Sequence, residues 1–251
     1  MTVGSTVQVS DLEFDHGFFD SAAFARAALA GWQQLAAVVD SALLAPHATR
    51  AEIEKLCEQA ARYRFACVVV NPVWTAVAVK LLSGSGVAVG SVVGFPLGAS
   101  LVSTLCQEAA ALLRLGVREL NLVIPIGQLK SGNHHAVEND VRAVVHVARH
   151  HGATVKAILE TGLLSVEENL RAAEVSIQAG ADFIQTATGF SSSGANPSDV
   201  ALLRGVAGSR SGVSASGGVR TLADVRALLE AGASRIGTQA AVEIVRELGA
   251  E

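Results

Sequence analysis

The chain has 251 residues, half of them hydrophobic, with a mean hydropathy of +0.41 and a formal net charge of −4. This is ample apolar material for one large core, and there is no basic excess to attract nucleic acid or an anionic membrane. The aromatic content of 4% also argues against a surface that stacks bases.

The cysteines and the N-terminal segment bear on the cellular compartment. The three cysteines lack the spacing of a metal site, and their odd number favours reduced thiols. The N-terminal segment lacks the basic and apolar stretches of a signal peptide, and no apolar run is long enough to span a bilayer. The sequence therefore predicts a cytoplasmic protein without nucleic-acid or membrane partners.

The chain opens with apolar residues at helical spacing over 18–35, which predicts one N-terminal helix. From residue 36 onward, short apolar runs alternate with amphipathic runs. The predicted strands are 36–40, 65–70, 87–93, 118–124, 153–159, 182–186, 212–215 and 234–237. Helical patterns between them include 50–63, 101–115, 166–179 and 222–230.

The repetition of these units predicts the fold. Eight strand–helix units in a chain of 251 residues match a (β/α)8 barrel, and continuous apolar strands fit a parallel sheet buried on both faces. A doubly wound sheet is the alternative, but the sequence has neither the glycine-rich dinucleotide turn nor a P-loop. We expect a single α/β TIM barrel over residues 36–251, preceded by an N-terminal helical extension over residues 1–35.

Lys156 lies in the middle of a predicted buried strand, unlike the other three lysines of the chain. A buried ammonium is costly unless it is paired or loses its proton. Desolvation favours the free amine, which is the group that forms an imine with a carbonyl substrate. The alternative is an ion pair with Glu160, which alternation places on the same strand face, or with another acid.

Further polar residues follow the other strands, where the active site of such a barrel lies. Asp40 is expected at the end of the first strand, Asn121 on the fourth and Ser214 on the seventh. Glycine turns after the last strands would let backbone N–H groups approach an anion, although a plain tight turn explains one Gly-Gly pair equally well. Arg220 and Arg235 are candidates for additional positive charge there.

Eight segments of the chain, taken together, resemble the deoxyribose-phosphate aldolase family in the same order along about residues 36–245. The segments are 40–46, 70–72, 93–98, 155–161, 180–184, 186–190, 215–220 and 235–238. The resemblance implies a class I aldolase that joins acetaldehyde to glyceraldehyde 3-phosphate reversibly, without a metal or other cofactor. It places the imine lysine on Lys156 and leaves monomer and homodimer open.

The resemblance also implies a substrate site after the last three strands. Its glycine turns would hold the phosphate of the substrate. The residues expected there are Thr186, Gly189, Ser216, Gly217, Gly218, Gly237 and Thr238.

The sequence departs from the family pattern where the family relays protons. Asn121 replaces an aspartate and Ser214 replaces a second lysine; Gln185 replaces another lysine, and Gln239 replaces a phosphate-binding serine. Asparagine orients water but takes no proton at neutral pH, and Ser214 removes a like charge that would acidify the imine lysine. We therefore expect the standard reaction to be slow or absent, and the lost cations weaken the case for a phosphorylated substrate.

Three hypotheses follow. The first is a divergent lyase that forms an imine between Lys156 and a small carbonyl compound, with Asn121, Ser214 and Glu160 positioning water or substrate. The second is a non-catalytic homologue that acts as a binding or regulatory protein. The third is a weak 2-deoxyribose-5-phosphate aldolase whose relay is rebuilt from Asp40 or Glu160.

Overall fold

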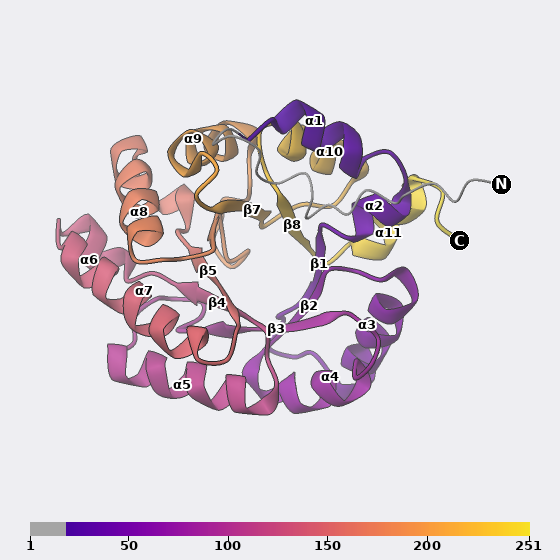
Figure 1. Ribbon diagram of the computed structural model, residues 1–251, viewed down its shortest axis with the longest axis horizontal. Helices are drawn as coiled ribbons and strands as arrows, with labels where there is room; N and C mark the ends of the chain where they lie inside the picture. The colour runs from indigo at the N-terminus through magenta and orange to yellow at the C-terminus, as the bar shows by residue number, and fades with distance from the viewer. Residues whose placement is uncertain (1–18) are drawn as a thin grey trace.

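The computed structural model describes residues 19–251 and shows a closed barrel of eight parallel strands inside a ring of helices (Figure 1). The strands pair in chain order, and β8 pairs with β1 to close the barrel. This confirms the predicted (β/α)8 fold. The strands are β1 (Val39–Leu43), β2 (Cys67–Val70), β3 (Ala88–Val93), β4 (Glu119–Val123), β5 (Thr154–Ile158), β6 (Phe183–Gln185), β7 (Gly212–Ser216) and β8 (Arg235–Thr238).

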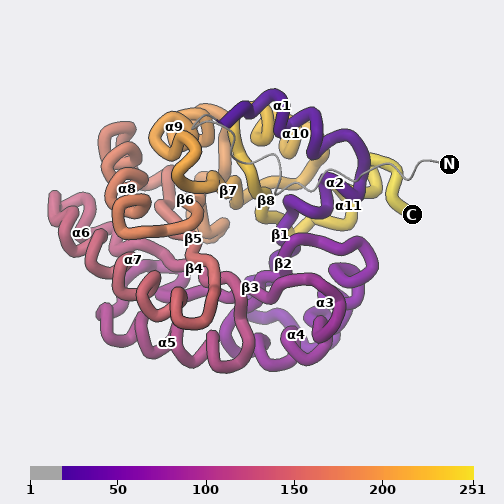
Figure 2. Tube along the Cα trace, viewed as in Figure 1, coloured from indigo at the N-terminus to yellow at the C-terminus, as the bar shows by residue number. Residues whose placement is uncertain are grey.

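Helices cover the outside of the barrel, and the Cα trace follows them around the ring in chain order (Figure 2). The longer helices are α3 (Arg50–Tyr63), α5 (Val102–Leu115), α7 (His134–Arg149), α8 (Val166–Gln178), α9 (Pro197–Ala207) and α10 (Leu222–Glu230). Shorter ones are α4 (Thr75–Leu81), α6 (Ile126–Lys130), α11 (Ala241–Glu247) and the 3₁₀ turns η2 (Pro72–Trp74) and η3 (Thr161–Leu163). No helix within residues 19–251 combines the length and hydropathy needed to cross a bilayer.

The core has two parts, because successive side chains of each strand point to opposite faces. Outward side chains such as Val155 and Ala157 join the large core between barrel and helices. Inside the barrel, Cys67, Val69 and Val92 form a small separate cluster. The barrel interior therefore has an apolar wall on the side of β2 and β3.

The N-terminal segment differs from its prediction, because the structure has two helices in place of one. Helix α1 (Ser21–Ala28) is capped by Asp20, whose side chain accepts from the backbone N–H of Ala23, and α2 (Trp32–Ala36) starts after the extended backbone of Gly31. Helix α1 packs on α10, and α2 packs on α11 (Figure 1). Residues 1–18 of the predicted extension lie outside the described residues.

Strand β1 also starts later than expected, since α2 continues to residue 36. Asp40 therefore lies near the beginning of the strand and not at its end. It pairs in register with Cys67 on β2 and Gly237 on β8. This register places the Asp40 carboxylate inside the barrel.

The ring of Phe183, the first residue of β6, lies inside the barrel beside Lys156 and Arg235. Gly212 faces this ring from β7, and a Cβ atom at Gly212 would lie 2.2 Å from it. The missing side chain at residue 212 therefore makes room for an aromatic ring inside the barrel.

Candidate active site

Lys156 is fully buried inside the barrel and is held by two carboxylates. Its Nζ donates a hydrogen bond to Asp40 Oδ2 and lies 2.6 Å from Oε2 of Glu119, a contact without the alignment of a hydrogen bond. Of the interpretations left open by the sequence, the ion pair is the one observed. Its partners are Asp40 and Glu119, and Glu160 takes no part.

Arg235 completes a buried network of four charges. Its two terminal nitrogens bind Asp40 Oδ1 and Glu119 Oε1, each at 3.0 Å, and its side chain is 15% exposed. Two cations and two anions therefore neutralise one another, with each carboxylate contacting both cations. The expectation that Arg235 adds charge to the glycine turns was wrong, because its side chain points into the barrel.

The ion pairs reverse the pKa shift expected for Lys156. Burial alone would lower the pKa of the ammonium, but the charges of Asp40 and Glu119 outweigh burial and raise it. For Glu119, burial would raise the pKa, whereas Lys156 and Arg235 lower it to about 2. The prediction of a free amine was wrong, because it considered the desolvation of Lys156 without the charges of Asp40 and Glu119. With these charges, Lys156 is an ammonium before a substrate binds.

Glu119 was not among the residues selected from the sequence. It lies two positions before Asn121 on β4, so both side chains point into the barrel. An acidic residue on the inward face of a buried strand rarely lacks a charged partner. That signal, applied to the segment Glu119–Val123, would have identified it.

Two further groups border the four charges. The Phe183 ring centroid lies 5.5 Å from Lys156 Nζ and 5.6 Å from Arg235 Cζ, within the range of cation–π contacts. Burial raises the pKa of the Cys67 thiol well above its ordinary value, and the Glu119 and Asp40 charges raise it further. Donor atoms of Cys67 and the two carboxylates converge within 4.8 Å, but Lys156 and Arg235 already neutralise these carboxylates. The set therefore does not fit a metal cation.

A narrow cavity of about 20 Å³ borders this network, with room for about one water molecule. Asp40 and Asn121 line it beside apolar groups that include Val69, Val92 and Ile158. It shares lining residues with a second, wider cavity of about 550 Å³ at the mouth of the barrel. The two cavities form a funnel that ends at Asp40, the hydrogen-bond partner of Lys156, and Lys156 itself lines neither cavity.

Asn121 and Ser214 lie inside the barrel close to this narrow cavity. Asn121 neighbours Lys156 in strand register; its Nδ2 lies 3.5 Å from the carbonyl oxygen of Ser91, and its Oδ1 has no partner within residues 19–251. The Ser214 hydroxyl donates to Gln185 Oε1 at 3.4 Å. In the part of the chain described, neither residue hydrogen-bonds Lys156, so neither replaces the family's relay by direct contact.

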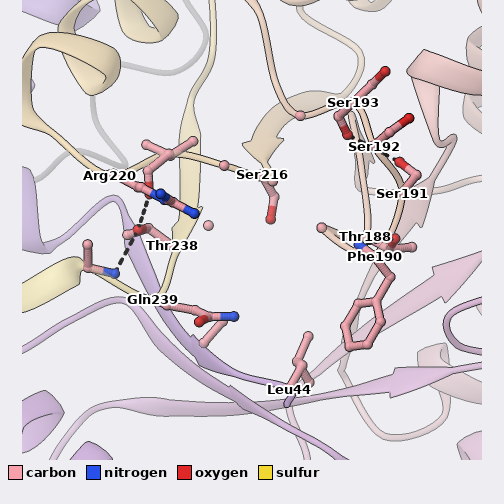
Figure 3. Close-up of a pocket in the computed structure, with 18 of the residues that line it drawn as sticks. Leu44, Thr188, Phe190, Ser191, Ser192, Ser193, Ser216, Arg220, Thr238 and Gln239 are labelled. Carbon is pink, nitrogen blue, oxygen red and sulfur yellow. Dashed lines mark hydrogen bonds between the residues drawn. The ribbon is translucent and has the colours of Figure 1, made fainter. Parts of the chain in front are cut away.

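The wider cavity collects most of the predicted substrate residues (Figure 3). Those lining it are Gly189, Ser216, Gly217, Gly218, Gly237 and Thr238. Gly217 has a φ of 100°, a backbone conformation that favours glycine, and Arg220 and Glu243 bring one charge of each sign to the wall. The structure thus brings these residues together, and their binding of phosphate stays a prediction.

Two of the predicted substrate residues hold the scaffold of this cavity. Thr186 does not line it; its hydroxyl donates to the carbonyl of Ser216 at 2.8 Å and accepts from the Ser216 N–H at 3.0 Å. The Thr238 hydroxyl donates to the carbonyl of Val219 and accepts from the N–H of Ala240 (Figure 3). Both hydroxyls are therefore occupied by backbone groups that fix the turns.

Glu160 lies beyond the end of β5 and anchors the loop on the opposite wall of the wide cavity. Its backbone is left-handed, with φ at 58°, and its carboxylate accepts from Thr188 N–H at 3.1 Å and from the hydroxyl of Ser191 at 2.7 Å. Phe190 in this loop contacts Phe95 edge to face at 5.2 Å. Glu160 thus positions a wall of the cavity and does not touch Lys156.

Replacing Glu160 with glutamine will loosen this loop. A hydrogen bond to a charged group contributes about 1.5–3 kcal/mol, and the neutral amide retains only one accepting oxygen. We expect backbone amides of residues 188–194 to exchange with solvent about tenfold faster, measured by hydrogen-exchange mass spectrometry. Glu58→Gln on the exposed face of α3 is the control, and equal exchange in the two variants would contradict the anchoring role.

Comparison with known proteins places this site in context. The sequence matches the family described as DeoC/LacD family aldolase over residues 9–243. It is 49% identical over 211 residues to the deoxyribose-phosphate aldolase of Geobacillus sp. (strain WCH70), covering 84% of this chain and 94% of that protein. It is 46% identical over 214 residues to the corresponding protein of Caldanaerobacter subterraneus subsp. tengcongensis, covering 85% and 93%.

A solved structure shows the same architecture. Deoxyribose phosphate aldolase from Aeropyrum pernix, described as a unique tetramer, superposes with a TM-score of 0.84 at 34% sequence identity. The match covers 91% of this chain and 96% of that one.

Proposed function

The chain belongs to the DeoC/LacD family of aldolases, and on this basis we propose that it makes or breaks a carbon–carbon bond through an imine on Lys156. The carbonyl compound is small, because its reacting end has to enter the narrow cavity. The observation that carries the proposal is the position of Lys156: a buried amine beside the end of a funnel, with Asp40 between the amine and the cavity.

The two cavities have different tasks in this proposal. The carbonyl group enters the narrow cavity, where Val69, Val92 and Ile158 exclude bulk water, and the flexible lysine stem turns its Nζ toward it. The Asn121 Oδ1, which has no hydrogen-bond partner within residues 19–251, accepts a hydrogen bond from a water molecule or from the hydroxyl of the first adduct. Asn121 thereby positions a reactant without taking a proton.

The wide cavity receives the remainder of the substrate. The relatives are named deoxyribose-phosphate aldolases, so 2-deoxyribose 5-phosphate is the first substrate to test. The turn at Gly217 and Gly218, together with Arg220, would hold its phosphate, while Glu243 in the same wall opposes an anion. An unphosphorylated aldehyde with a hydroxylated tail is the second substrate to test.

One observation favours a non-catalytic binding protein as the second candidate function. Asp40 and Glu119 hold Lys156 as an ammonium and raise its pKa, whereas attack on a carbonyl requires the free amine. In the binding protein, Lys156 would serve as a fixed charge and the funnel as a metabolite site. Assembly is open as well: a mass measurement in solution would distinguish the homodimer from a tetramer like that of the Aeropyrum pernix relative.

Borohydride trapping tests the proposal directly. The protein is incubated with acetaldehyde, 2-deoxyribose 5-phosphate and a panel of small aldehydes and ketones, and is then reduced and mapped by mass spectrometry. We expect a stable adduct on Lys156 and none on Lys55, Lys80 or Lys130. The carbonyl compound that traps fastest indicates the substrate class. Tight binding of a metabolite with no adduct from any compound would favour the non-catalytic function.

A further inference from the structure

Two carboxylates contact the same lysine nitrogen, but their surroundings differ. Asp40 accepts a hydrogen bond from Lys156 Nζ and lines the narrow cavity, so it contacts both the amine and the place where a carbonyl would react. Glu119 forms an ion pair with the same nitrogen but does not line that cavity. Arg235 binds the second oxygen of each.

Imine formation removes two protons from the nitrogen, and both leave in the water molecule. An ammonium and a carbonyl compound give an iminium ion and one water molecule, so the total charge and the number of protons stay the same. The positive charge is on the nitrogen at the beginning and at the end. Between these states the amine has to be neutral, because only its lone pair can attack. The site therefore needs a temporary proton acceptor and a lasting anion.

Few groups around Lys156 can take that proton. The titratable groups that face it are Asp40 from β1, Cys67 from β2, Glu119 from β4 and Arg235 from β8. Arg235 is already a cation, and the pKa of the Cys67 thiol is raised by burial, so its conjugate base is not populated at neutral pH. The amide of Asn121 and the hydroxyl of Ser214 are not bases in this pH range.

This inference rests on the imine proposed for Lys156 and adds the groups that move its proton. We propose that Asp40 is the temporary acceptor of the Lys156 proton and that Glu119 stays ionised as the lasting counter-ion of the nitrogen. These roles replace the relay that is missing at Asn121 and Ser214.

The Lys156 ammonium gives a proton to Asp40, and the nitrogen lone pair attacks the carbonyl carbon while the carbon–oxygen π electrons move to oxygen. A second proton passes from nitrogen to that oxygen and gives a neutral carbinolamine. Asp40 then protonates the hydroxyl group, the carbon–oxygen bond breaks, and water leaves. The nitrogen keeps one proton and the positive charge, and Asp40 is an anion again.

The different surroundings explain why the two roles fall this way. Asp40 borders the cavity, so its proton can reach the leaving hydroxyl. Glu119 lies away from the cavity, so it has no path for a proton to the leaving hydroxyl, and its ion pair with Arg235 persists throughout the reaction. It therefore stays ionised while the nitrogen changes from ammonium to iminium. Two carboxylates with two roles set by their environments are a known catalytic arrangement.

The test compares isosteric, neutral variants of the two acids in a time course of borohydride trapping with acetaldehyde. At pH 7, Asp40→Asn will slow adduct formation on Lys156 by about 10²–10⁴-fold, the range typical of a lost acid–base group. Glu119→Gln removes the counter-ion but no proton carrier, so it will slow adduct formation by less than about tenfold, and the midpoint of its pH–rate profile will lie below that of the wild type. A purely structural role would slow the two variants equally and leave the midpoint where it is.

Two additions protect the test against misfolding. Thermal melts check each variant, and Asp40→Glu retains a carboxylate and should trap within tenfold of the wild-type rate. If the wild type traps at Lys156, two results would overturn this inference and leave the proposed function intact. One is equal slowing in Asp40→Asn and Glu119→Gln, and the other is no slowing in Asp40→Asn. Absence of a wild-type adduct on Lys156 would instead refute the imine itself.

Discussion

Replacing Lys156 with methionine will abolish the borohydride-stable adduct and reduce carbon–carbon bond cleavage to background. Methionine fills the volume of the lysine stem but offers no amine, so no imine can form. Loss of a covalent nucleophile costs on the order of 10⁶-fold in turnover in a well-studied hydrolase, and we expect a loss of that order here. The measurement is trapping with acetaldehyde followed by cleavage of 2-deoxyribose 5-phosphate.

Two controls separate chemistry from folding. Lys156→Arg keeps a cation between Asp40 and Glu119, but a guanidinium does not lose its proton, so this variant should fold and remain inactive. Lys130→Met removes an exposed lysine that pairs with Glu168 at 2.8 Å and should leave trapping unchanged. Turnover in Lys156→Met at the wild-type rate would refute the imine mechanism.

Replacing Arg235 with methionine will destabilise the barrel by about 3–5 kcal/mol, the cost of removing one partner from a buried ion pair. The wild-type network is neutral, but the variant leaves Asp40 and Glu119 facing one cation. Urea unfolding at pH 7 measures the change in free energy of unfolding. Arg171→Met is the matched control, because Arg171 pairs with Glu174 on the exposed face of α8, where such a pair contributes at most about 1 kcal/mol. Equal losses in the two variants would contradict the predicted effect.

The same network predicts how stability depends on pH. The pKa of Glu119 is lowered from 4.5 to about 2, so its stabilisation is present above 4.5 and is lost as the pH falls toward 2. The pKa of Lys156 is raised, so its stabilisation is complete below 10.5 and is lost as the pH rises through the higher folded value. Arg235→Met removes one cation from Glu119, so the stability lost on acidification should be smaller than in the wild type and should be complete at a higher pH, as measured by urea unfolding over a series of pH values.

The fold was predictable because short apolar runs and amphipathic runs alternate regularly along the chain. Helices α3 and α10 match the predicted ranges at both ends, since charged and polar residues clearly mark their outer faces. The start of β1 was missed because Ala36 continues a helix after the break at Gly31. An alanine is apolar in either structure, so local composition could not decide between helix and strand there.

The candidate site was predictable in part. Lys156 was identified because a lysine in a buried strand is rare, and the structure places it inside the barrel. Glu119 and Arg235 were missed as neighbours of Lys156, because they come from two other strands, β4 and β8. Alternation shows that a side chain points inward, but not which inward side chains meet across the barrel. Without those partners, the direction of the Lys156 pKa shift could not be derived.

The network of four charges also bears on how long the folded barrel survives. Asp40 and Arg235 are 195 positions apart, and Lys156 lies between them on β5, so only a nearly complete chain contains every partner. Contacts that close such long loops are expected to form late, when β8 docks on β1. Stabilisation gained after the folding transition state slows unfolding and leaves the folding rate nearly unchanged. The four charges around Lys156 are therefore expected to set the lifetime of the folded protein as well.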